Sequence, residues 1–192
     1  MEWIEKNHLA ILPIYNVEHG NCTLVIDDED QTVVKKTIKT AVKKLCEHNH
    51  VDQKAANSYY GKKLSIRTGI PIVLSLDRIY IQLKVREPIG KDDGAMGYFR
   101  LNGISQVLER EGRAVIRLKN NAEIPCLCTA ETARKTISKG ELVKDLKTNV
   151  AVTSVREALE YYYTTDAPAM KSDIARLCMK VDDIFTILKT LK

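Results

Sequence analysis

The sequence lacks any long hydrophobic run and any recognisable targeting segment. No stretch approaches the roughly 18 to 20 consecutive apolar residues that a helix needs to cross a bilayer. Residues 1–6 show neither a basic start followed by an apolar stretch nor a small-residue cleavage site, so they do not indicate a secretory signal. We therefore expect a cytoplasmic protein that does not interact with membranes.

Common catalytic motifs are also missing. The sequence has no glycine-rich phosphate loop, no nucleophile elbow and no metalloprotease helix, and it contains no internal repeat. A cysteine nucleophile paired with a distant histidine is the enzymatic alternative that stays open. We expect a protein that is not an enzyme and that carries no cofactor.

Cysteine is too scarce and too irregularly spaced to form a disulfide framework. Five cysteines are an odd count in a chain of 192 residues, which is large enough to fold without disulfides, so we expect reduced thiols. Candidate metal ligands do cluster at Cys46, His48 and His50, and again at Cys126 and Cys128. A structural zinc site usually has about two to four residues between paired cysteines, however, and alternate strand positions equally suit two core thiols. We expect no bound metal.

What the sequence does have is an ordinary globular composition and an uneven distribution of charge. Its length fits one large domain, or one domain with an appendage, given about 100 to 200 residues per domain. The segment 33–67 contains nine basic residues against Glu47 and Asp52, so it carries +7 while the rest of the chain sums to −2. A phosphate backbone attracts such a segment because each neutralised phosphate releases counterions. A solvated, lysine-rich helix face is the alternative.

Hydrophobic periodicity predicts an α+β fold with a β-rich body of antiparallel strands. Apolar spacings of three and four predict one basic amphipathic helix at 32–47, whereas 51–68 shows no period and is expected to be a loop or a loop with a short strand. Pro13 is expected to end the first strand. The strands are predicted at 8–14, 21–26, 70–76, 78–85, 98–101, 104–110, 114–119 and 123–127.

The last third of the chain is expected to be helical. Thr129 can cap a helix over 130–146, and Ser154 begins a capping box before a second helix. We place a boundary at 148–153, between a body at 1–150 and a helical appendage at 151–192 that serves dimerisation or partner docking. A final helical stretch at 171–191 fits a helical hairpin better than a helix-turn-helix, with the packing residues Ile174, Leu177, Val181, Ile184, Ile187 and Leu191.

The strongest candidate site lies at residues 57–63, which combine two tyrosines, a serine, a glycine and two lysines. The lysines can neutralise phosphates, the hydroxyls can donate to phosphate oxygens, and the glycine lets the backbone approach a groove. An inserting arm of this type would read the minor groove of DNA. A hairpin whose tyrosines cover the core is the alternative. The expected DNA contacts are Ser58, Tyr59, Tyr60, Gly61, Lys62, Lys63 and Arg67, with Lys36, Lys39, Lys43 and Lys44 as further phosphate neutralisers.

Several features taken in order resemble the competence transcription factor ComK family. They are residues 10–13, Cys46 at the end of a lysine-bearing helix, residues 58–63, residues 71–72, and the late hairpin at 116–121, so the resemblance covers about 8–137. The family pattern reads serine, tyrosine, any residue, glycine, arginine, lysine. Ser58, Tyr59, Gly61 and Lys63 match it.

This chain departs from the family at three places. Lys62 stands where the family has arginine, which keeps the charge but loses the planar group that suits a narrow minor groove. Leu64 and Ser65 follow the motif without the family's glycine, and residues 97–100 replace an expected cysteine and tryptophan. The resemblance implies a transcription activator that binds AT-rich promoter boxes through the minor groove as an oligomer.

A shorter segment is similar to the LytTR type of β-rich DNA-binding domain. Residues 99–101, Ile104, the strand at 114–119 and residues 121–125 before a helix carry this resemblance. Both resemblances imply double-stranded DNA as the partner. We therefore expect a DNA-binding transcription regulator that forms a homo-oligomer, with a regulatory protein partner possible in addition. The alternative is a protein-interaction or adaptor module that uses the C-terminal helices.

Overall fold

The computed structural model describes residues 2–91, 93–164 and 171–190, with the backbone only for residues 2, 173, 151–164 and 185–190. The chain divides into two compact units, Met1–Val150 and Ala151–Lys192. The expected α+β fold is confirmed, because antiparallel sheets and helices both contribute large parts of the chain. The helices are α1 (Ile38–His48), α2 (Gln53–Leu64), α3 (Ala130–Thr164) and α4 (Lys171–Thr190), and two short 3-10 turns cover Glu2–Ile4 and Leu101–Gly103.

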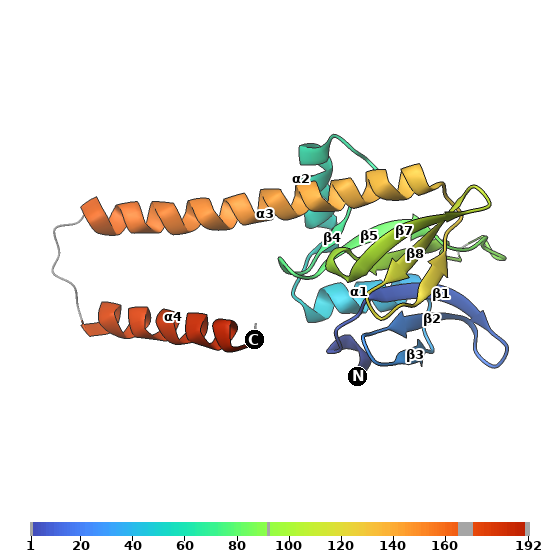
Figure 1. Ribbon diagram of the computed structural model, residues 1–192, viewed down its shortest axis with the longest axis horizontal. Helices are drawn as coiled ribbons and strands as arrows, with labels where there is room; N and C mark the ends of the chain where they lie inside the picture. The colour runs from blue at the N-terminus through green and yellow to red at the C-terminus, as the bar shows by residue number, and fades with distance from the viewer. Residues whose placement is uncertain (1, 92, 165–170, 191–192) are drawn as a thin grey trace. The chain divides into compact units, whose positions relative to one another are not determined.

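Two antiparallel sheets form the body (Figure 1). The larger sheet has the strand order β3-β2-β1-β6-β5-β4, and the smaller has the order β7-β8-β9. The strands of the larger sheet are β1 (Ala10–Asn16), β2 (Gly20–Ile26), β3 (Gln31–Val34), β4 (Ile72–Val73), β5 (Ile79–Lys84) and β6 (Met96–Arg100). Those of the smaller sheet are β7 (Ile104–Arg110), β8 (Arg113–Leu118) and β9 (Glu123–Pro125).

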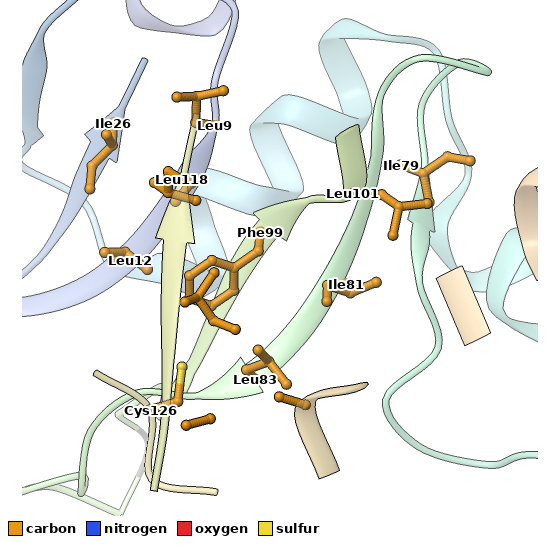
Figure 2. Packing of buried hydrophobic residues seen from close by; sticks show 14 of the residues in the cluster. Leu9, Leu12, Ile26, Ile79, Ile81, Leu83, Phe99, Leu101, Leu118 and Cys126 are labelled. Carbon is orange, nitrogen blue, oxygen red and sulfur yellow. The ribbon is translucent and has the colours of Figure 1, made fainter. Parts of the chain in front are cut away.

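The larger sheet is buried on both faces because successive strand residues point to opposite sides. Along β5, Ile79 and Ile81 join the cluster that the smaller sheet and the start of α3 cover, whereas Tyr80 joins the cluster beneath α1. Figure 2 shows Phe99 of β6 in the cluster between the two sheets, together with Leu118 of β8 and Cys126. The body is therefore layered, with α1 on one face of the larger sheet and the smaller sheet with α3 on the other.

The predicted strand positions are confirmed by every strand from β4 onward, and β1 and β2 appear near their expected places. The prediction that Pro13 ends the first strand is wrong, because β1 continues to Asn16 and Pro13 lies opposite Thr23 of β2. The pairing of β1 with β6 covers only Ala10 and Ile11. From Leu12 onward β1 pairs with β2 alone, so one side of this part of the strand needs no backbone hydrogen bonds. A proline, which has no amide hydrogen, is tolerated at such a position.

The basic helix begins later than predicted. Its predicted start at 32 is wrong, because residues 31–34 form β3, where Val34 pairs with Thr23 and is buried. The side chain of Thr37 then caps α1 by accepting a hydrogen bond from the Thr40 amide. The β-branched residues before Thr37 therefore extend the sheet, and the acidic turn at 27–30 precedes a strand instead of a helix.

The prediction of a loop at 51–68 is wrong over most of its length, since 53–64 form α2. Asp52 caps this helix by accepting hydrogen bonds from the amides of Lys54 and Ala55 at 2.9 and 3.0 Å. Ser65 ends it in the left-handed conformation, and the Ile66 amide donates to the Gly61 carbonyl oxygen at 2.9 Å. Both ends of α2 are thus defined by local hydrogen bonds rather than by hydrophobic periodicity.

The helical last third is confirmed, but its predicted subdivision is wrong. Thr129 caps α3 by accepting from the Thr132 amide at 3.2 Å, as expected, yet the helix continues past 146 and past Ser154 to Thr164. Thr136, Ser138 and Thr148 each donate a hydrogen bond to the carbonyl oxygen four residues earlier in the helix, which for Thr148 is that of Lys144 at 2.9 Å. Helix α4 confirms the last helical stretch, but four of its expected packing residues, Ile174, Leu177, Val181 and Ile184, are exposed. The side chains of the other two, Ile187 and Leu191, lie outside the described residues. None of the helices in the described ranges combines the length and apolar composition that crossing a bilayer requires.

Candidate nucleic-acid interface

The exposed face of α2 presents most of the residues expected to bind DNA. One row along the helix consists of Lys54, Ser58 and Lys62, which are four residues apart and therefore lie on one side of the helix. All of these side chains are exposed to solvent. The opposite side carries Tyr60 and Leu64, which pack against the core cluster shared by the two sheets. We call the exposed residues Lys54, Ser58, Tyr59, Lys62 and Lys63 the α2 face.

The two tyrosines of the predicted motif have different environments. Tyr59 is 45% exposed, and the ammonium nitrogen of Lys63 lies 5.9 Å from the centre of its ring. Tyr60 meets Tyr59 edge-on with ring centres 5.1 Å apart and is half-buried against the core. Burial raises the pKa of the Tyr60 hydroxyl, with a further contribution from Tyr59. Tyr59 is thus available to a ligand, whereas Tyr60 serves mainly to dock α2 on the body.

Gly61 has a structural role that differs from the expected one. It is buried, and a Cβ atom at this position would lie 3.0 Å from the Ile66 carbonyl oxygen and 3.0 Å from Cδ1 of Ile70. The sequence did not predict this packing role, and the expectation that Gly61 brings the backbone close to a groove stays a prediction. Its missing side chain lets the last turn of α2 pack against the segment that follows it.

A surface hollow of about 550 Å³ adjoins the α2 face on the side of Ser58 and Lys62. Arg67, in the segment after α2, contributes to the same hollow, so the structure brings together four of the expected contact residues, which are Ser58, Gly61, Lys62 and Arg67. No acidic residue is among those that line it, which are Asn57, Ser58, Gly61, Lys62, Ser65, Ile66, Arg67 and Ile70. We call this feature the α2 hollow, and its only charged side chains are cationic.

The lysines of α1 do not form one continuous patch with the α2 face. Lys43 pairs with Glu47 at 3.7 Å and lines a second hollow, of about 460 Å³, that also contains Asp52 and Lys54. Lys44 borders a different depression, together with Glu5, Glu47 and His48. Lys36 and Lys39 are exposed, Lys36 just before α1 and Lys39 in its first turn. Carboxylates near Lys43 and Lys44 make α1 a less favourable surface for phosphate than the α2 face.

Lys54 is a candidate contact that the sequence-based selection of contact residues omitted. It belongs to the basic segment 33–67, and α2 places it in the same row as Ser58 and Lys62. Two features of the sequence indicate this helix. Lys54, Ser58 and Lys62 are spaced four residues apart, and Asp52, a residue type that caps helices, stands just before them. In the part of the chain that the structure describes, no carboxylate lies within ion-pairing distance of Lys54, Lys62, Lys63 or Arg67.

Three of the thiols are poorly suited to act as nucleophiles, and the described residues hold no cluster of metal ligands. Burial raises the pKa of Cys46 to about 11 and that of Cys126 to about 12, and it also raises the pKa of Cys128. These thiols therefore stay protonated at neutral pH, whereas a nucleophilic cysteine needs its thiolate. Among the residues that the structure describes, no group of three or more potential ligands is arranged to hold a metal ion.

Comparison with known proteins gives no further guidance to the site. The chain matches no protein-family model, no curated protein and no solved structure. The geometry and the charge of the α2 face are therefore what indicate a function.

Proposed function

We propose that this protein binds double-stranded DNA through the α2 face and regulates transcription. The observation that carries the proposal is that Ser58, Lys62 and Arg67 surround a hollow without acidic residues, beside the exposed pair Tyr59 and Lys63. Cations that lack a carboxylate partner are free to neutralise phosphates, and each such contact releases counterions. Serine and tyrosine hydroxyls can donate hydrogen bonds to phosphate oxygens beside them.

The helical form of this segment changes the expected mode of binding. An α-helix with its side chains is about 10–12 Å across, which matches the major groove at about 12 Å but not the minor groove at about 6 Å. With 12 residues, α2 is roughly 18 Å long. The proposal therefore places α2 in or along the major groove, instead of the extended minor-groove arm that a loop would have provided.

The test measures the salt dependence of binding to labelled duplexes of about 30 base pairs, one AT-rich and one GC-rich. Replacing both Lys62 and Arg67 with alanine should weaken binding and reduce the slope of log K against log salt by ~2, since each cation neutralises about one phosphate. The matched control replaces Lys91 and Lys119, which are exposed on other loops, and removes the same net charge. This control should leave the slope near that of the wild type.

Two outcomes would contradict the proposal. Equal slopes for both double variants would show that only net charge matters and that the α2 face is not the contact surface. Absence of any DNA binding at about 50 mM salt would favour the alternative of a protein-interaction module, because electrostatic attraction is strongest at low salt.

A further inference from the structure

Helix α4 carries an exposed apolar stripe that the DNA-binding surface does not explain. Ile174, Leu177, Val181 and Ile184 are 57%, 63%, 41% and 56% exposed, which is unusual for large aliphatic side chains on one helix. Their spacings of three, four and three residues keep them on one side of the helix. We call these four residues the α4 stripe.

The spacing of the α4 stripe is that of a heptad repeat. With Ile174 and Val181 as a positions, Leu177 and Ile184 are d positions, and the sequence continues the same spacing at Leu188 and Leu191. Ile174 and Val181 are β-branched residues at a, and Leu177 is a leucine at d, a combination that favours two parallel strands, whereas Ile184 departs from it at d. A second copy of the same helix, parallel and in register, places each stripe residue opposite its own equivalent.

The charge of α4 also fits a second copy better than a polyanion. The helix contains four basic residues and three acidic ones, and none of them is at an a or d position of the stripe. Two copies therefore meet without strong like-charge repulsion. DNA or an anionic membrane surface would instead select a helix whose flanks are dominated by lysine and arginine.

We propose that this protein forms a homodimer through a parallel, in-register coiled coil of two α4 helices. Burying the half-exposed stripe residues removes on the order of 400 Å² of apolar surface per copy, or about 800 Å² for the pair, from water. This area is below the roughly 1,200 Å² of a standard stable interface, so the four described positions alone specify a weak dimer that depends on concentration. The proposal does not depend on DNA binding, because it concerns α4 alone.

The oligomeric state of the full chain tests this proposal. Sedimentation analysis without DNA, from about 1 to 100 µM, should show the wild type passing from monomer to dimer, whereas Leu177→Glu should stay monomeric at every concentration. The matched control is Met179→Glu, since Met179 is 69% exposed on the same helix but lies outside the stripe. This control should dimerise like the wild type.

Cross-linking distinguishes the parallel pair from other arrangements. In a Cys178→Ser background, Leu177→Cys should form an intermolecular disulfide under mild oxidation, because equivalent d positions face each other only in a parallel pair in register. Met179→Cys should not. A wild type that stays monomeric at about 100 µM, or a dimer that Leu177→Glu leaves intact, would overturn the proposal. An efficient link from Met179→Cys but not from Leu177→Cys would overturn it as well.

The dimer proposal and the DNA proposal fail separately. The Lys62 and Arg67 double variant should dimerise normally, and Leu177→Glu should keep the salt slope per monomer while losing apparent affinity for DNA. A DNA-binding defect confined to the first variant therefore says nothing about α4.

Discussion

The carboxylate of Asp52 accepts a hydrogen bond from the amide of Ala55 at 3.0 Å, and this contact marks the start of α2. The same carboxylate accepts from the Lys54 amide at 2.9 Å. Two amides of the first turn that would otherwise lack partners are satisfied in this way. Because α2 presents little apolar surface to the core, its order depends on such end contacts more than that of α1 does.

Removing this cap should destabilise α2 and weaken DNA binding indirectly. Asp52→Ala is expected to lower the free energy of unfolding by about 1 kcal/mol, the usual value for a lost N-cap. Asp52→Asn should retain most of the stability, since asparagine caps equally well while removing the charge. Urea denaturation and DNA titration of both variants check this. An Asn variant as unstable as the Ala variant would show that charge, not capping, stabilises the helix start.

The sequence predicted the body of the fold better than the candidate site. Strands such as β5 and β8 bury alternate or continuous apolar residues, so the burial that stabilises them is visible in the residue pattern. Helix α2 exposes half of its residues and fully buries only Gly61, so no apolar period marks it. Its signals were the aspartate at 52 and the lysine spacing, which become informative only when they are considered together.

Tertiary context explains the other differences. The spacing between Val34 and the apolar residues after it fits a helix. Val34 nevertheless belongs to β3, because this strand pairs with the edge of β2. Gly61 was expected to let the backbone approach DNA, and the structure shows it packed closely against Ile70. Ile70 lies beyond the end of α2, and no sequence pattern indicates that it contacts Gly61. The distances that decide these roles arise only when separate segments pack together, so the sequence could not supply them.

His8 should make the stability of the body sensitive to mild acid. Its ring is fully buried, one nitrogen lies at the Trp3 carbonyl oxygen, and the other has no partner in the described structure. Burial lowers its pKa below 6.5, and nearby Arg78 acts in the same direction. As the pH falls through 6.5 the unfolded chain gains a proton before the folded chain does, so the free energy of unfolding should decrease.

Urea denaturation at about pH 7.5 and pH 5.5 measures this effect, with both pH values chosen around the ordinary titration range of histidine. His8→Gln should be less stable overall but should lose much of the difference between the two pH values. His48→Gln is the control, since His48 is exposed. A pH difference that survives in His8→Gln would assign the acid sensitivity to another group.

Gly140 marks a close approach of α3 to the larger sheet. A Cβ atom at this position would lie 2.8 Å from Cγ2 of Ile81, a fully buried residue on β5, and 3.0 Å from Cδ1 of Leu101. Gly140→Val should therefore destabilise the protein by about 2 kcal/mol through overpacking. Ser138→Val introduces the same side chain at an exposed position of α3 and should cost much less. Similar midpoints of thermal unfolding for the two variants would show that the helix moves away from β5 at little cost.

The adjacent tyrosines of α2 should separate binding from folding. Tyr59 is exposed beside Lys63, so Tyr59→Ala should weaken DNA binding about 3- to 10-fold, the usual effect of losing one hydrogen bond to a phosphate oxygen. The salt slope should not change, because no charge is removed. Tyr60→Ala should instead lower the free energy of unfolding by about 2 kcal/mol, since this ring packs on the core. Anisotropy titration and urea denaturation of both variants give the comparison. The opposite result, in which Tyr59→Ala destabilises the fold and Tyr60→Ala affects only binding, would contradict these roles. It would mean that Tyr60, and not Tyr59, contacts DNA.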